Sequence, residues 1–182
     1  MRKYILVLLI VLSTVYVIAT VYGNDKASAT DQVTKKEPIW GSTFRDMAMS
    51  ITPRESQYEL GRTIEIIITL KNSGNEIVEL HEIRSIIRNY RFALFYPDGQ
   101  PVPKTERFKQ GEAYIGKPPV VFSRRLIRIE PGQTEPAAFS LKNWFQIDKE
   151  GTYLLVVMRR IERSWEQGFL ISNMAKINIT KS

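Results

Sequence analysis

Apolar and polar residues alternate with a period of two along most of the chain beyond residue 40, which is the pattern of half-buried β-strands. The clearest run is residues 64–71, in which every second residue from Ile64 to Leu70 is isoleucine or leucine. Turns rich in Asn, Gly and Pro separate runs of this kind. The pattern predicts strands at residues 47–51, 64–71, 78–80, 90–96, 126–129, 137–141, 153–158 and 175–179.

Two segments depart from this alternation. Leu80, Ile83, Ile87 and Tyr90 have helical spacing, so a short helix is expected around residues 82–89. Residues 141–147 are expected to form a single helical turn at a corner of the sheet.

The strand at 153–158 is introduced by Gly151-Thr152-Tyr153. In a tyrosine corner, a Tyr at the start of a sandwich strand donates its hydroxyl hydrogen to the chain just upstream. The sequence therefore predicts that Tyr153 bonds back to the chain near Asp148.

These segments carry a family resemblance. The sequences at 70–75, 90–102, 128–134 and 143–157 resemble bacterial immunoglobulin-like domains, and within that group they are similar to the BsuPI-type proteinase inhibitor domain. The resemblance extends over roughly residues 45–180. It implies an all-β, immunoglobulin-like antiparallel β-sandwich of about seven to nine strands, and proteinase inhibition as one expected activity.

The N-terminus has a different character. Arg2 and Lys3 precede an uncharged apolar run at residues 4–22, and Ala27-Ser28-Ala29 matches a signal-peptidase cleavage pattern. We expect residues 1–29 to be a signal peptide or a helical membrane anchor, 30–43 a flexible linker and 44–182 the sandwich. The domain is then extracytoplasmic, either secreted or periplasmic after cleavage, or held at the membrane by the N-terminal helix.

Composition excludes several kinds of chemistry. The chain has no cysteine, so it has no disulfide and no thiolate ligand or nucleophile, and His81 is its only histidine. Residues adjacent on a strand point to opposite faces, so the sequence around His81 assembles no catalytic group. The run at 111–118 resembles a phosphate-binding loop, but Pro118 stands where a Ser or Thr is required. We expect no enzyme activity, no catalytic residue, no cofactor and no metal.

Charge is unevenly distributed. Ten basic and three acidic residues lie between Arg84 and Arg128, so this segment accounts for the net charge of +7. Long basic connections on a sandwich commonly carry binding residues. The candidate binding residues come from the connection 101–125 with the strand that follows it, and from the connection 159–169: Arg107, Phe108, Lys109, Tyr114, Lys117, Arg124, Arg125, Arg128, Arg159, Arg160, Arg163, Trp165 and Phe169.

The sequence therefore favours an exported, non-enzymatic binding module that contacts a protein partner at the cell envelope. The alternatives are a BsuPI-type proteinase inhibitor that presents one loop to a protease, and a carbohydrate-binding module. Anionic glycan and lipid headgroups are alternative ligands for the basic loop, and the N-terminal segment contacts the membrane if it is retained. Nucleic acid is disfavoured, because the domain is exported and carries no recognised nucleic-acid module.

Overall fold

The computed structural model describes residues 38–83, 89–113, 124–141, 144–161 and 168–181 of the 182-residue chain. These residues belong to one compact unit, Glu37–Ser182, and residues 1–36 form a separate unit outside the described part. The expected signal or anchor segment, residues 1–29, therefore lies outside the described residues. Among the helices that are described, none has the length and apolar character needed to cross a membrane.

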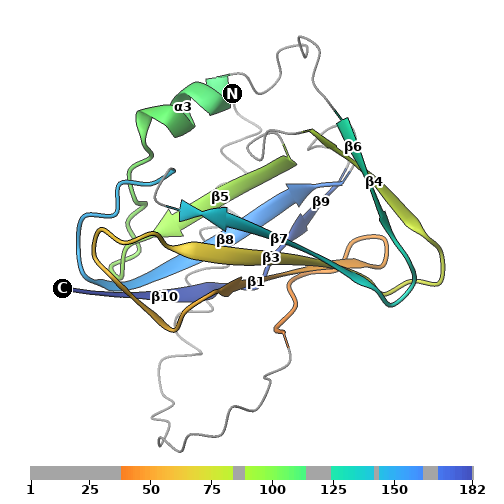
Figure 1. The fold of residues 1–182 in the computed structure, drawn as a ribbon, viewed down its shortest axis with the longest axis horizontal. Helices are drawn as coiled ribbons and strands as arrows, with labels where there is room; N and C mark the ends of the chain where they lie inside the picture. The colour runs from red at the N-terminus through yellow and green to blue at the C-terminus, as the bar shows by residue number, and fades with distance from the viewer. Residues whose placement is uncertain (1–37, 84–88, 114–123, 142–143, 162–167, 182) are drawn as a thin grey trace, which may run out of the picture. The chain divides into compact units, whose positions relative to one another are not determined.

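Two sheets, antiparallel except for one strand pair, and a separate ribbon make up the described part of the domain (Figure 1). The smaller sheet has the strand order β1 (Met47–Pro53), β3 (Glu65–Asn72), β7 (Thr134–Ser140). The larger sheet has the order β2 (Gln57–Glu59), β10 (Ala175–Thr180), β8 (Gly151–Arg160), β5 (Tyr90–Phe95), and β9 (Phe169–Ile171) also pairs with β8. The ribbon pairs β4 (Val78–Ile83) with β6 (Arg124–Ile129). Among the strand pairs in the described residues, β2 and β10 alone run parallel to each other.

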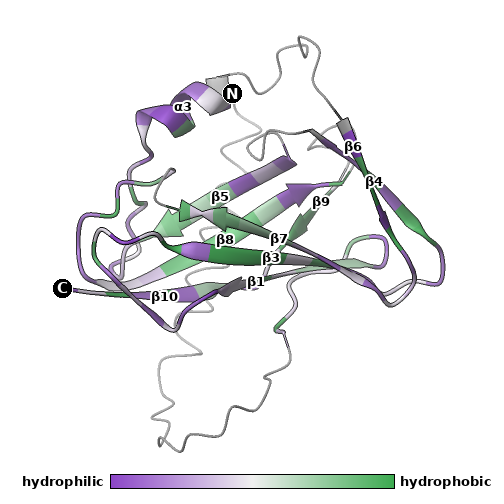
Figure 2. Ribbon diagram, viewed as in Figure 1, coloured by the Kyte–Doolittle hydropathy of each residue, from purple (hydrophilic) through white to green (hydrophobic). Residues whose placement is uncertain are grey.

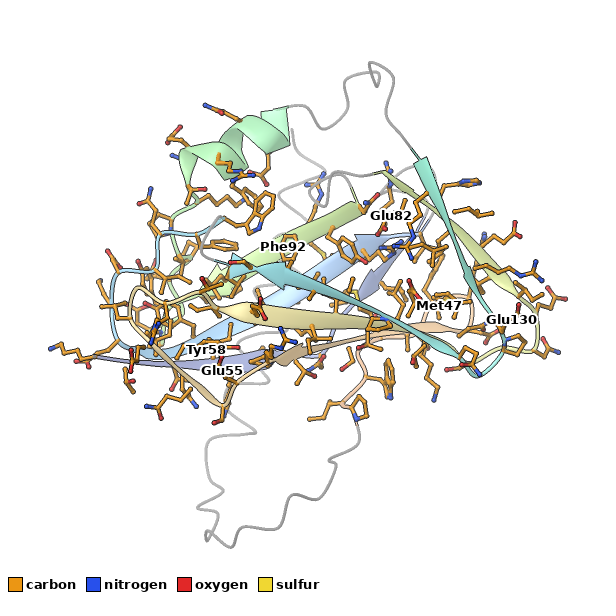
Figure 3. The ribbon with its side chains drawn as sticks, in the orientation of Figure 1. Met47, Glu55, Tyr58, Glu82, Phe92 and Glu130 are labelled. Atoms are coloured by element: carbon orange, nitrogen blue, oxygen red, sulfur yellow. The ribbon has the colours of Figure 1, made fainter. Side chains whose placement is uncertain are left out.

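The apolar faces of the two sheets enclose one core. Burial alternates along β3 as the sequence predicts, with every second residue from Ile66 to Leu70 almost fully buried. The rings of Phe92 on β5 and Phe139 on β7 meet across the interior with their centroids 4.6 Å apart. Figure 2 shows apolar residues concentrated on β3, β5 and β8, and Figure 3 places Phe92 between the sheets. The all-β, immunoglobulin-like sandwich is therefore confirmed.

The tyrosine corner forms at the start of β8. Tyr153 is fully buried, and its hydroxyl donates a hydrogen bond of 2.7 Å to the carbonyl oxygen of Lys149, one residue beyond the expected Asp148. Gly151, two residues earlier, has a φ of 138°, a value that L side chains rarely adopt. This bond fixes the path by which the chain enters the central strand of the larger sheet.

A β-bulge divides the last strand into β9 and β10. Ile171 pairs with Met158 whereas Ala175 pairs with Leu155, so the register shifts by one residue between them. Asn173, in the bulge, turns toward the other sheet: its side-chain oxygen accepts from the Ile51 backbone N–H at 2.7 Å, and its amide donates to the Ile51 carbonyl at 3.1 Å. The bulge therefore links the two sheets at the edge of β1.

Three elements were missed by the sequence pattern. Strands β2 and β9 have only three residues each, too few for an alternating pattern to be recognised in the sequence. Helix α3 (Glu106–Ala113) lies in the connection expected to be a loop.

The helical turn at 141–147 is supported by hydrogen bonds from the Trp144 and Phe145 backbone N–H groups to the Leu141 carbonyl. The helix expected at 82–89 falls mainly on residues outside the described ones.

The expected linker, residues 30–43, ends inside the folded unit. The Gly41 N–H donates to the Met49 carbonyl at 2.9 Å, and the Ser42 N–H donates to the Ile171 carbonyl at 3.0 Å. A Cβ at position 41 would lie 2.0 Å from the Ile171 carbonyl oxygen, so only glycine fits there. The C-terminal residues of the expected linker are thus part of the sandwich.

We expect Tyr153→Phe to lower the free energy of unfolding by about 1–3 kcal/mol, because it leaves the Lys149 carbonyl without its donor. Tyr96→Phe is the matched control, since the Tyr96 hydroxyl bonds the exposed Asp148 side chain at 3.1 Å and its loss should cost less than about 1 kcal/mol. Equilibrium urea unfolding measures both. Equal effects would contradict a structural role for the corner.

Candidate interaction surfaces

Helix α3 carries three of the expected binding residues, and one of them is in the core. Phe108 is only 1% exposed and packs against the rings of Trp144 and Phe145, with centroids 5.4 and 5.6 Å away. The expectation that Phe108 is a surface contact is therefore corrected. Arg107 and Lys109 are exposed on the same helix, and Lys109 pairs with Glu106 at 2.6 Å.

Three further expected residues lie on β6, in the ribbon. Arg128 falls in the strand expected at 126–129, whereas Arg124 and Arg125, expected in the connection, also belong to this strand. Arg125 and Arg128 are exposed and form ion pairs with Glu135 at 3.0 Å and Glu130 at 3.1 Å. Arg124 is the first residue of the strand. Because the ion pairs of Arg125 and Arg128 are exposed, they contribute little to the stability of the fold, and the arginine side chains are available to another molecule.

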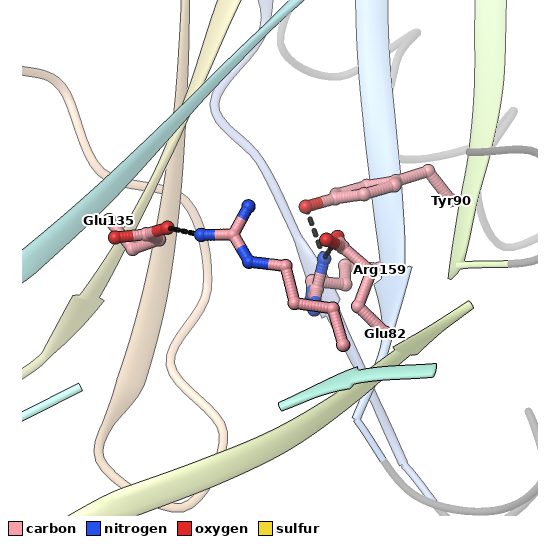
Figure 4. Close-up of polar contacts among 5 residues, drawn as sticks. Glu82, Tyr90, Glu135 and Arg159 are labelled. Atoms are coloured by element: carbon pink, nitrogen blue, oxygen red, sulfur yellow. Dashed lines mark hydrogen bonds and ion pairs between the residues drawn. The ribbon is translucent and has the colours of Figure 1, made fainter. Parts of the chain in front are cut away.

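Arg159 is a correction to the expected second binding loop. It lies inside strand β8 and is 1% exposed. One guanidinium nitrogen, Nη1, donates to Glu82 Oε1 at 3.1 Å and also to the Tyr90 hydroxyl, while the guanidinium carbon lies 4.7 Å from the centre of the Tyr90 ring (Figure 4). A buried cation needs such partners, because desolvation of an unpaired charge costs several kcal/mol. Arg159 therefore joins β4 and β5 to β8.

The other expected residues of that loop have different locations. Arg160 is the last residue of β8, and Phe169 is the first of β9; both are half-buried. A strand thus begins where the loop was expected to end. Arg163 and Trp165 lie outside the described residues, as do Tyr114 and Lys117 of the first connection.

A polar hollow of about 590 Å³ lies beside β2, where Glu55, Glu59 and Arg62 line it. The hollow is remote from the ion pairs of β6: Figure 3 shows Glu55 and Tyr58 on the opposite side of the view from Glu130, the partner of Arg128. Arg62 pairs with Glu59 at 3.4 Å, which leaves the hollow with little net charge. Within the described ranges, no three His, Asp or Glu side chains gather as a metal would require.

The outer face of the ribbon brings the expected Arg128 together with residues that the sequence pattern did not select. Exposed Glu79 and His81 on β4 stand opposite Arg128 and Leu126 on β6. Leu126 is 51% exposed, and Ile77, just before β4, is 42% exposed; these are two of the three large exposed apolar side chains in the part of the chain that is described. The alternation predicted strands at 78–80 and 126–129, but not that they pair with each other as a separate ribbon. His81 faces a leucine, so the neighbour across the ribbon supplies no catalytic group.

The fold and these surfaces define an immunoglobulin-like β-sandwich whose accessible features are strand edges and charged faces. Comparison with known families makes this specific: the model of the flagellar collar protein C N-terminal domain matches residues 54–180. The chain belongs to this family. The finer resemblance to BsuPI-type inhibitor domains is not shown by the comparisons. Among curated proteins, no sequence matches the chain significantly.

Solved structures give distant similarities of fold. The C-terminal domain of Wzt has a TM-score of 0.43 and 14% identity, over 81% of this chain and 80% of that one. The CARDB domain of a Pyrococcus furiosus protein has a TM-score of 0.37 and 10% identity, over 78% of this chain and 100% of that one. A β-glucosidase from Listeria innocua has a TM-score of 0.40 and 10% identity, over 77% of this chain and 17% of the enzyme. None of these similarities indicates what this chain binds.

We expect Glu82→Gln to lower the free energy of unfolding by about 3 kcal/mol, because it leaves the buried Arg159 guanidinium without a countercharge. Glu130→Gln is the matched control: it breaks the exposed pair with Arg128 and should change stability by less than about 1 kcal/mol. Urea unfolding at neutral pH distinguishes the two. A change at Glu82 no larger than at Glu130 would show that the buried pair is not needed.

Burial raises the pKa of Tyr90 above its ordinary value of about 10, although the nearby Arg159 charge opposes the shift. An unfolded tyrosine loses its proton near pH 10 while the folded one keeps it. The contribution of Tyr90 is therefore complete below about pH 10 and decreases as the pH rises further. We expect the free energy of unfolding of Tyr90→Phe to fall less steeply between about pH 9 and 11 than that of the unmodified chain. If the free energies of unfolding of the two chains change equally with pH over this range, Tyr90 does not couple stability to pH.

Proposed function

We propose that this chain is a non-enzymatic structural component of a flagellar collar, associated with the cell envelope, and that it acts through protein–protein contacts. The observation that carries the proposal is the family match over residues 54–180, which runs from just after β1 to the last residue of β10. It covers nearly all of the sandwich.

The character of the surface supports a contact role. The exposed features in the described residues include the ion pairs of Arg125 and Arg128 on β6, the exposed Arg107 on α3, and the outer face of the ribbon. Charged pairs of this kind favour specific, reversible protein contacts rather than chemistry on a small substrate. The basic N-terminus and the apolar run at 4–22 support export to the envelope.

The proposal is tested by imaging flagellar motors in cells from which this chain has been deleted. We expect electron cryo-tomography to show motors with reduced or absent collar density. Expression of the full chain from a second locus should restore the density, and a tag at its C-terminus should appear as added density in the collar. An unchanged collar in the deletion strain would refute the proposal.

A further inference from the structure

Residues 40–44 form a strap that lies between the edges of the two sheets. On one side, Phe44 and Met47 of β1 exchange two backbone hydrogen bonds of 2.9 and 3.0 Å. On the other side, the Ser42 N–H donates to the Ile171 carbonyl of β9 at 3.0 Å, and the Ile171 N–H donates to the Ser42 hydroxyl at 3.3 Å. The strap therefore fills a slot whose two walls are β1 and β9.

The slot fits this segment closely. A Cβ at Gly168, just before β9, would lie 2.3 Å from the Phe44 ring, and a Cβ at Gly41 would lie 2.0 Å from a carbonyl oxygen of β9. The ring of Trp40 packs under the ammonium group of Lys71 on β3, with 5.4 Å between the nitrogen and the ring centre. Without a strap, the outward backbone groups of β1 and β9 would lose these partners. The slot therefore needs a strand as its occupant.

The turn that joins the strap to β1 is strained. Arg45 and Asp46 have φ values of 47° and 59°, and neither is glycine. Two residues with positive φ between a hydrogen-bonded pair form a type I′ turn, for which Asn-Gly is the favoured sequence. In this conformation the Cβ of an L residue lies too close to the following carbonyl oxygen. A short hinge under strain invites the exchange of the element that it connects.

We propose that two copies of this chain exchange their straps, so that residues 40–44 of each copy fill the slot of the other. Each strap then makes the same contacts as before, but with the other copy, and the turn at Arg45 and Asp46 opens into extended chain. Opening relieves the unfavourable φ at both positions while the strap contacts are kept. Exchange of an identical element is a low-cost route to a dimer. This proposal is independent of the collar function.

The hinge also suits a contact between identical chains. Phe44 of each copy lies opposite Met47 of the other, so the two chains cross in antiparallel directions between residues 45 and 46. Arg45 of each copy then lies across from Asp46 of the other, which brings opposite charges together on both sides of a two-fold axis. Both side chains are exposed in the single copy. The Asp46 carbonyl accepts from the Ser73 N–H at 2.7 Å, which holds the end of the hinge on its own domain.

Substitutions in the hinge test the exchange in both directions. Arg45→Asn combined with Asp46→Gly supplies the residues that the closed turn prefers, so the dimer dissociation constant should rise at least about tenfold. Asp46→Pro cannot adopt a positive φ and also favours an extended Arg45, so the dissociation constant should fall about tenfold. Sedimentation of full-length chains in mild detergent, refolded from urea at each concentration so that the straps equilibrate, measures both.

Asp98→Asn is the matched control, because it places Asn before Gly99 in a turn that the exchange does not use. It should leave the dissociation constant unchanged. Equal dissociation constants for the two hinge variants, or shifts in the opposite directions, would overturn the proposal. So would an Asp46→Pro chain that stays monomeric.

A complementation experiment tests whether the strap is the element exchanged. Gly41→Val keeps a strap out of every slot, because its side chain would meet the β9 carbonyl, and Gly168→Val blocks a slot against Phe44. Neither variant should dimerise alone. Their mixture contains one intact strap and one intact slot, so differently tagged chains should co-purify as a heterodimer. A mixture of folded variants that yields no heterodimer would overturn the proposal, and the hinge variants decide it if either glycine variant fails to fold.

Discussion

The hydrogen-bonding groups at the sheet edges are the constraint on which this structure depends. A sandwich of open sheets exposes rows of N–H and C=O groups that water or protein must satisfy. Here the N-terminal segment and the Asn173 bulge cover β1, and the Pro101–Val102 segment covers part of β5. Within the described residues, β4 and β6 pair only with each other, so each has one edge without a strand partner. The disposition of edges therefore determines which side of the domain another strand can reach.

The strand β8 is where the parts of the domain are joined. It pairs with β10, β5 and β9, and the Tyr153 hydroxyl fixes its entrance. Near its far end, Arg159 holds Glu82 of the ribbon and Tyr90 of β5. The ribbon is therefore not an independent hairpin: a buried charge network connects it to the central strand. A ribbon held in this way keeps a defined orientation relative to β8.

The sequence predicted the long strands and the tyrosine corner because both depend on local features, namely period-two alternation and the Gly-x-Tyr spacing. It failed where the environment of a residue is set by distant parts of the chain. Phe108 was assigned to a basic loop, but Trp144 and Phe145 enclose it. Arg159 was assigned to a loop because the expected strand ended at residue 158, although Arg159 shares the parity of Tyr153, Leu155 and Val157, all buried on β8. Strand parity was a better guide there than the expected end of the strand. The sequence predicted the strands at 78–80 and 126–129, but not that they pair and place His81 opposite Leu126.

The attachment of the N-terminal segment has a mechanical consequence. Gly41 bonds to Met49 in the smaller sheet, and the next residue, Ser42, bonds to Ile171 in the larger one. Tension transmitted through the preceding residues would enter both layers of the sandwich at the same point. Neither layer would be peeled off alone, because the load is divided where the two are already joined by Asn173. A domain that is pulled from its leading end is thus reinforced at the place where the force arrives.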